Sequence, residues 1–221
     1  MFTFSRLIVL SSLVMPALAM AQASMSVEQK IAAALKGEHR TEAELARDAD
    51  RDPMAALQFI GLRDDMTVIE FLPAAQAYYT KILGPVLVDN GHLMTVDNSN
   101  TFSSWGDWAE EPEFKMTHPV VIENNYSREE GRYVPGEIEF GVAEADLFLH
   151  FREYHNFNEA DNMRINAKVF DTLKSGGEYV VVDHTRRHMQ PETGVLGRRE
   201  DPVDVIPVSY THLTLPTKRI V

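Results

Sequence analysis

The order of hydrophobic periods between residues 66 and 96 constrains the fold more than any other feature of the sequence. Residues 66–72 are apolar and rich in β-branched side chains up to Pro73, as expected of a parallel strand buried on both faces. Residues 76–88 repeat apolar side chains at helical spacing, and residues 92–96 again have the character of a strand. This order predicts a right-handed βαβ unit.

The later part of the chain repeats this alternation. Residues 145–151 predict a strand, residues 163–173 a helix closed by Ser175-Gly176-Gly177, and residues 178–183 another strand. Residues 98–137 show no sustained period and predict short helices and loops. Alternating strands and helices predict an α/β fold, with a parallel sheet covered by helices on both faces.

A helical lead segment, residues 24–61, precedes the alternating body. Ser26 with Gln29, and Thr41 with Glu44, have the spacing of capping boxes, in which each side chain satisfies a backbone N–H of the other residue. Pro53 favours a third helix start, because proline suits the first helical position.

Both ends differ from the body in composition. Residues 1–23 contain one arginine, an apolar run and small residues at two A-x-A sites, which predicts a signal peptide and a periplasmic or secreted protein. An uncleaved N-terminal anchor is the alternative; after cleavage we expect no stable membrane span. Residues 208–221, beginning VSYTHLTLPT, resemble a translated sequencing adapter and are expected to be non-native, although a natural strand would also fit. The α/β domain is then residues 62–207, with its C-terminal strands truncated.

Charge and composition exclude several classes of function. The net charge of −12 argues against a nucleic-acid partner held by a global positive field, and the lack of cysteine removes thiolate nucleophiles and Cys-ligated zinc. His150 and His155 flank Glu153 in HFREYH, which is not the H-E-x-x-H zinc motif, so we expect no metal site. No P-loop is present.

Several segments, taken in order, resemble a family of exported class I S-adenosylmethionine-dependent methyltransferase-like proteins. They are RDPMAALQFIG at 51–61, MTVIE at 66–70 followed by Pro73, FREYHN at 151–156, LKSGG at 173–177 and VVDH at 181–184. The resemblance covers about residues 47–206. It implies a Rossmann-like class I methyltransferase sheet, S-adenosylmethionine as the cofactor, and a small-molecule acceptor of the methyl group.

The resemblance also implies a cofactor site at the first turn. This site comprises Glu70 in the first strand and the turn residues Pro73, Ala74, Ala75 and Gln76. Where the family has proline followed by several glycines, this chain has alanine and glutamine, whose Cβ atoms make positive φ angles costly.

Asp97, at the end of the second strand, is placed to accept ribose hydroxyls of the cofactor. A solvated turn residue is an equally good interpretation of its position.

Candidate catalytic residues lie at later strand ends, where α/β proteins gather their polar groups. They are Arg152, His155, Asp183 and His184. His155 is expected near the acceptor, or else as a loop histidine bonded to backbone. Asp183 and His184 would act as orienter and base only if the turn brings them together, because neighbours on a strand point to opposite faces.

Two functions therefore remain open. The first is methyl transfer to a small acceptor, and the second is a pseudo-enzyme, a non-catalytic exported ligand-binding or scaffold protein with the same fold. A dinucleotide-dependent oxidoreductase is disfavoured, because the first turn lacks G-x-G-x-x-G.

Overall fold

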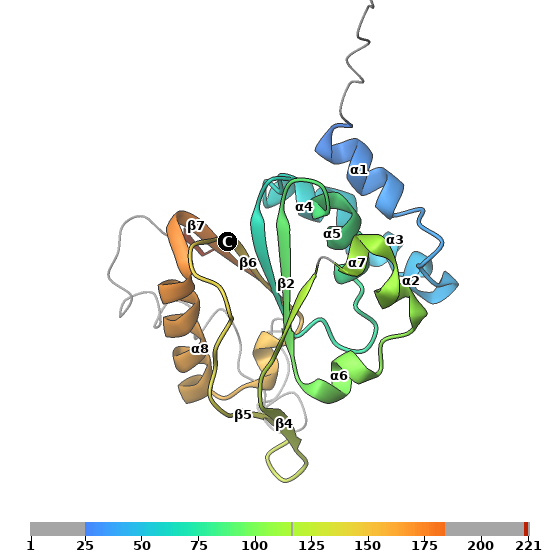
Figure 1. Ribbon diagram of the computed structural model, residues 1–221. Helices are drawn as coiled ribbons and strands as arrows, with labels where there is room; N and C mark the ends of the chain where they lie inside the picture. The colour runs from blue at the N-terminus through green and yellow to red at the C-terminus, as the bar shows by residue number, and fades with distance from the viewer. Residues whose placement is uncertain (1–24, 116, 184–218, 221) are drawn as a thin grey trace, which may run out of the picture.

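The computed structural model describes residues 25–115, 117–183 and 219–220, and its first half contains both a helical lead and the start of the sheet (Figure 1). The elements up to the second strand are α1 Val27–Ala34, α2 Glu42–Ala46, α3 Asp48–Arg51, α4 Pro53–Phe59, β1 Thr67–Phe71, α5 Thr80–Leu87 and β2 His92–Asp97. Both capping boxes are formed as predicted, at the starts of α1 and α2.

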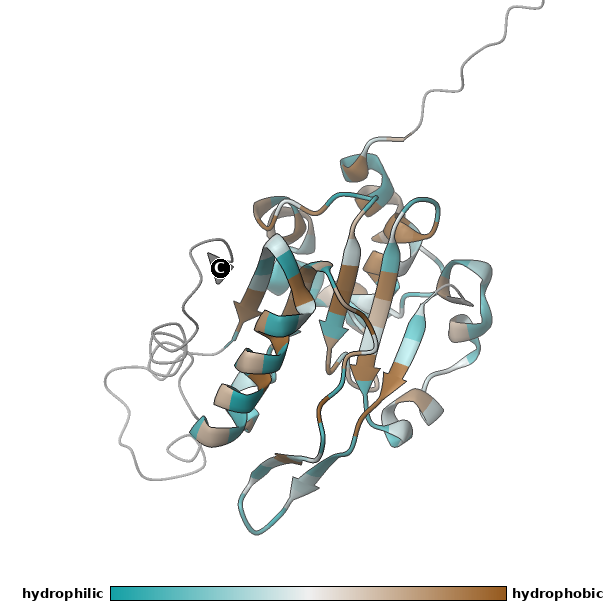
Figure 2. Cartoon of the chain, turned by 60° about the vertical axis from the view of Figure 1, so that its left-hand side comes forward, coloured by the Kyte–Doolittle hydropathy of each residue, from teal (hydrophilic) through white to brown (hydrophobic). Residues whose placement is uncertain are grey.

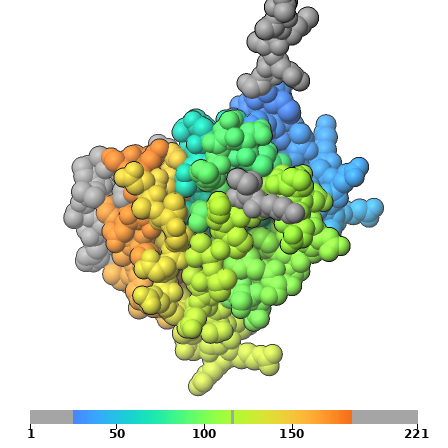
Figure 3. Space-filling model, viewed as in Figure 1, coloured from blue at the N-terminus to red at the C-terminus, as the bar shows by residue number. Residues whose placement is uncertain are grey.

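The second half completes the sheet and adds a hairpin. Its elements are α6 Ser99–Ser103, η1 Asp107–Glu110, α7 Pro112–Lys115, β3 His118–Val121, β4 Asn124–Ser127, β5 Arg132–Pro135, β6 Ala145–Phe151, η2 Tyr154–Asn156, α8 Glu159–Thr172, β7 Leu173–Val182 and β8 Arg219–Ile220. The main sheet has the order β3-β2-β1-β6-β7-β8, and its strands pair in parallel. The antiparallel β4–β5 hairpin projects from the molecule in Figure 3.

Helices cover both faces of the sheet, which explains why the central strands β1, β2 and β6 are buried almost throughout. Alternate side chains enter two different cores: Val68 of β1 packs with the helical lead and α5, whereas the next residue, Ile69, packs toward α8. Leu147 and Phe148 of β6 divide in the same way. Figure 2 shows the apolar strands lying behind α8. The predicted Rossmann-like α/β sheet is confirmed.

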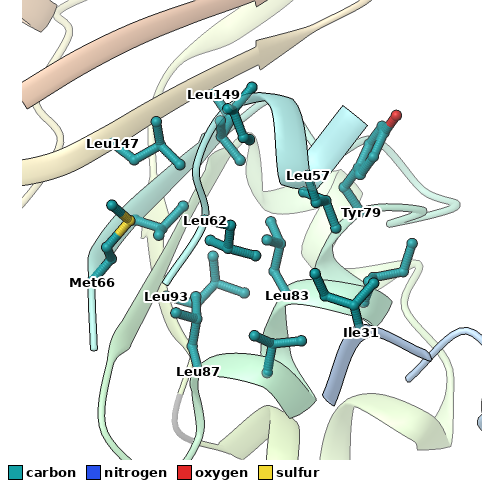
Figure 4. Close-up of a cluster of buried hydrophobic side chains, with 14 of the residues drawn as sticks. Ile31, Leu57, Leu62, Met66, Tyr79, Leu83, Leu87, Leu93, Leu147 and Leu149 are labelled. Atoms are coloured by element: carbon teal, nitrogen blue, oxygen red, sulfur yellow. The ribbon is translucent and has the colours of Figure 1, made fainter. Parts of the chain in front are cut away.

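The first core joins the helical lead to the sheet. Ile31 of α1, Leu57 of α4 and Leu83 of α5 are each no more than 1% exposed and converge on Leu93 and Leu147 of the strands (Figure 4). Burial of one such side chain contributes about 1.5–3 kcal/mol. The lead is therefore an integral layer of the fold.

Two helix boundaries differ from the prediction. Helix α5 begins at Thr80 rather than residue 76, because the chain first makes a turn in which the N–H of Ala77 donates to the carbonyl of Ala74. Helix α8 begins at Glu159 rather than residue 163, because the Asn158 side chain accepts from the N–H of Asp161 and caps it.

Strand content was also underestimated. Residues 98–137 contain the predicted short helices but also β3, β4 and β5, and β3 joins the main sheet beside β2. Strand β7 begins at Leu173, so the Ser175-Gly176-Gly177 segment lies within it as an irregular stretch with a register shift against β6. Gly176 has φ of +81°, and a Cβ on Gly177 would lie 2.8 Å from the carbonyl oxygen of Ala145.

The predicted signal peptide lies outside the described residues, as does most of the 208–221 segment. In the described part of the chain, no helix combines the length and hydropathy needed to cross a bilayer. Arg219 and Ile220 pair with Glu178 and Tyr179 of β7.

Candidate functional site

A small cavity lies where the strand order reverses. Strand β2 leads away from β1 on one side and β6 pairs with β1 on the other, so the switch point is the β1–β6 boundary. A cavity of about 80 Å³ at this boundary is lined by residues 70–74 and 151–153, from the carboxyl ends of the two strands. Gln76, Tyr78 and Tyr79 and the helical-lead residues Arg47 and Arg51 complete the lining.

Backbone strain is concentrated around this cavity. Among the described residues, six that are not glycine have positive φ angles, and three of them, Leu72, Ala74 and Arg152, line it. Ala74 has φ of 59° and Ala77 has φ of 48°, conformations that cost an L-residue about 1 kcal/mol or more. The turn after β1 thus adopts left-handed geometry without glycine, contrary to the steric expectation from its sequence.

Asp97 and Trp105 hold this turn in place. Asp97 is only 3% exposed, so it is not a solvated turn residue. Its Oδ2 accepts from the N–H of Ala74 at 3.2 Å, and its Oδ1 accepts from the N–H of Asn98 at 2.7 Å. Trp105 donates its indole N–H to the carbonyl of Ala74 at 3.2 Å. Burial raises the pKa of Asp97, although these hydrogen bonds oppose that shift.

Glu70 lies in the floor of the cavity and anchors the next helix. The hydroxyl of Thr80, the first residue of α5, donates to Glu70 Oε2 at 2.6 Å. Burial raises the pKa of Glu70 to about 7, and the nearby charge of Asp97 acts in the same direction. Glu70 is therefore partly protonated near neutral pH.

The end of β6 presents a second carboxyl group to the cavity. Arg152 has φ of 66° and is held there by its N–H, which donates to the carbonyl of Val182 at 2.7 Å. The next residue, Glu153, accepts from the side-chain amide of Asn156 at 2.7 Å. Burial raises the pKa of Glu153 to about 6.

His155 and Asp183 form a pair across the ends of β6 and β7. The imidazole Nδ1 lies 2.6 Å from Asp183 Oδ1, and the backbone N–H of His155 donates to Oδ2 at 2.7 Å. The Asp183 side chain is fully buried and that of His155 is 7% exposed. Asp183 therefore orients His155. The partner of Nδ1 is this carboxylate, so the alternative in which the histidine ring bonds to the backbone is wrong for Nδ1.

His150 is removed from this chemistry by burial. Its ring is completely buried, Nδ1 lies 3.0 Å from the hydroxyl of Tyr179, and burial lowers its pKa to about 3. Elsewhere in the described residues, one group of three has metal-ligand character: donor atoms of His39, Glu111 and Glu113 lie within 4.8 Å of one another. No resemblance or pattern in the sequence pointed to it.

The structure brings half of the ten predicted site residues to one cavity. Glu70, Pro73, Ala74, Gln76 and Arg152 line it, whereas Ala75 is exposed outside it. Asp97 contacts the turn, His155 and Asp183 pair with each other outside the lining, and His184 lies outside the described residues.

Sequence reasoning missed Arg47, Arg51 and Glu153, which line the cavity. It offered Trp105 as the lining of an acceptor pocket or as part of a packed helix, whereas Trp105 fixes the turn after β1 through the carbonyl of Ala74. A signal existed only for Arg51 and Glu153, which belong to the two segments RDPMAALQFIG and FREYHN.

Asp97 offers chemistry that the expected cofactor would use, but the cavity as it stands is too small for the whole cofactor. A buried carboxylate ends β2 beside a tightly curved turn, as ribose recognition at a switch point requires. The cavity of about 80 Å³ takes only a small group, because whole-ligand pockets measure about 300–1,000 Å³. A complete nucleoside cofactor would need the turn to move.

The chain resembles known proteins in its three-dimensional structure and not detectably in its sequence. No protein-family model matches the chain, and no curated protein matches it in sequence. The structure is similar to a candidate O-methyltransferase from Nostoc punctiforme (12% identity, TM-score 0.53), covering 84% of this chain and 60% of the other. It is similar to a SAM-dependent methyltransferase from Aquifex aeolicus (14% identity, TM-score 0.55), covering 74% of this chain and 79% of the other.

A further similarity is to human N-acetylserotonin methyltransferase in complex with SAM (10% identity, TM-score 0.51), covering 86% of this chain and 51% of the other. The chain thus spans 60% or less of two of these three proteins. At these identities the likeness concerns architecture and carries over no substrate. The chain has the Rossmann-like fold of class I S-adenosylmethionine-dependent methyltransferases.

Proposed function

We propose that this protein transfers a methyl group from S-adenosylmethionine to a small acceptor. One observation carries the proposal: the cavity lies at the β1–β6 switch point, directly beside a turn that a buried carboxylate at the end of β2 holds in place. Ligands of open α/β sheets bind in this position. The expected export of the chain, to the periplasm or beyond, is part of the proposal and is supported by the pattern of residues 1–23.

The turn and Asp97 would hold the cofactor, which supplies an electrophilic methyl group when bound. Asp97 would accept the ribose hydroxyls after releasing the N–H of Ala74, and the left-handed turn would let its backbone approach the cofactor. Strain in this turn lowers the free-energy cost of the rearrangement, because the conformation without ligand already contains that strain.

His155 would take the proton from the acceptor. Donation from Nδ1 to Asp183 would fix the tautomer in which Nε2 is the basic ring nitrogen. Glu153, on the wall of the cavity and with its pKa raised to about 6, is the competing base. Positioning for in-line attack supplies much of the remaining rate.

Calorimetry on the full chain tests the proposal. We expect S-adenosylhomocysteine to bind with a dissociation constant below about 1 mM, and Asp97→Asn to weaken it at least tenfold. Asp171→Asn, a change at an exposed position of α8, is the matched control and should leave binding unchanged. Absence of binding heat at millimolar S-adenosylhomocysteine would exclude the proposed methyl transfer. That result would favour the alternative, a non-catalytic ligand-binding or scaffold protein.

A further inference from the structure

Three arginines surround the switch-point cavity. Arg47 follows α2 and Arg51 ends α3, both in the helical lead, while Arg152 follows β6 more than a hundred residues later. The tertiary fold alone brings these guanidinium groups to one opening. All three line the same cavity, and repulsion by Arg152 and Arg47 adds to burial in lowering the pKa of Arg51.

None of these three arginines forms an ion pair within the part of the chain that the structure describes. The carboxylate of Asp48 is held by Arg40, at 2.6 and 2.9 Å. The guanidinium of Arg51 instead stacks on the ring of Tyr78, 4.2 Å from its centre. This stacking orients Arg51, whose charge attracts the Asp48 carboxylate without a direct ion pair between them.

The two acidic residues of the cavity do not supply the missing partners. Glu70 accepts from Thr80, and Glu153 accepts from Asn156. Burial raises the pKa of Glu70 to about 7, so only part of its negative charge is present near neutral pH, whereas Glu153, with a pKa of about 6, is mostly ionised there. The three arginines of the lining still outnumber its two acidic groups, so the opening retains an excess of positive charge.

The backbone at Arg152 gives an independent reason to regard this arrangement as a binding site. An arginine gains nothing from left-handed geometry, yet Arg152 has φ of 66° and is held there by a hydrogen bond to Val182. Such strain gathers at ligand sites, where the fold imposes a side-chain direction. The cavity of about 80 Å³ has room for one group of a few heavy atoms.

We propose that Arg47, Arg51 and Arg152 form a subsite for a carboxylate group on the methyl acceptor. The planar guanidinium matches a carboxylate in two-point hydrogen bonding. The amino-acid end of S-adenosylmethionine also carries a carboxylate, but its ammonium and sulfonium charges would be repelled by three arginines. The substrate class is thus an anionic small molecule, and this inference rests on the proposed methyl transfer.

Thermal unfolding of the full chain with simple probes tests the subsite. We expect acetate to raise the midpoint above that in chloride at equal ionic strength, with acetamide as the neutral control. The double variant Arg51→Gln/Arg152→Gln should weaken the apparent acetate affinity at least tenfold. Arg63→Gln/Arg128→Gln makes the same change in net charge elsewhere and should keep the response. An equal response in both double variants, or no response in the wild type, overturns the subsite.

A second arm separates the acceptor from the cofactor. With saturating S-adenosylhomocysteine, the acetate-dependent shift should persist, because the two ligands are proposed to contact different residues. Loss of the acetate-dependent shift in the unfolding midpoint would overturn the acceptor assignment. It would indicate that the arginines bind the carboxylate of the cofactor. Calorimetry with S-adenosylhomocysteine alone reports separately on the proposed function, so a cofactor-binding protein without an acetate response refutes only the subsite.

Discussion

The carboxyl ends of β1 and β2 hold their charged groups differently from the carboxyl ends of β6 and β7. Beyond β1 and β2, Glu70 and Asp97 are satisfied by a hydroxyl and backbone N–H groups, and the turn between them is strained. Beyond β6 and β7, Asp183 instead holds the ring and the backbone of His155 together. In the first half, called here the closed half, hydrogen bonds within the protein occupy the carboxylates, and a ligand could replace these bonds. In the second half, the assembled half, the carboxylate already orients the imidazole.

The largest expected effect breaks the assembled half. Asp183→Ala leaves the His155 ring and its N–H without their shared acceptor, and loss of one partner of a buried pair costs about 4 kcal/mol. Urea unfolding measures this loss. Asp171→Ala, at an exposed position, should change the free energy of unfolding by less than about 0.5 kcal/mol. Equal effects would show that Asp183 is not the anchor of this half.

The pH dependence of stability probes the closed half. The folded pKa of Glu70 is about 7 against an ordinary 4.5, so the folded state binds the extra proton between these values. Its contribution to stability is present below pH 4.5 and is lost as pH rises through 7, by about 3 kcal/mol. Asp97, whose pKa burial also raises, acts with the same sign.

Glu70→Gln removes this ionisation while keeping an acceptor for Thr80. The variant should therefore lose less stability than the wild type between pH 5 and pH 8, as followed by urea unfolding at each pH. Parallel curves for the two proteins would contradict a raised pKa at Glu70.

The smallest expected effect concerns strain in the turn. Ala74→Gly relieves a left-handed residue and should stabilise the fold by up to about 1 kcal/mol, because glycine accepts positive φ without a steric cost. Ala75→Gly makes the same chemical change at an exposed neighbour outside the set of positive-φ residues and should be neutral or destabilising. Thermal unfolding compares them, and the reverse order would remove the case for strain.

Local pattern predicted the elements of the βαβ body and the helical lead from the sequence alone, but it missed strands β3, β4 and β5. The capping boxes at Ser26 and Thr41 depend on contacts three residues apart, so they can be predicted without the fold. Strand β6 matches its prediction to the residue, because burial on both faces demands a continuous apolar run. The α/β class and the candidate strand ends followed from the same signals.

Only the tertiary structure decided which strand-end residues meet. Asp183 orients His155, which is 28 residues away in the chain, and this pairing depends on β6 lying beside β7. Arg51 reaches Arg152 only because the helical lead packs against the sheet. Positive φ at Ala74 is likewise imposed from outside, by Asp97 and Trp105, against the residue's own preference. Local propensity costs about 1 kcal/mol at such a position, and the surrounding contacts outweigh it.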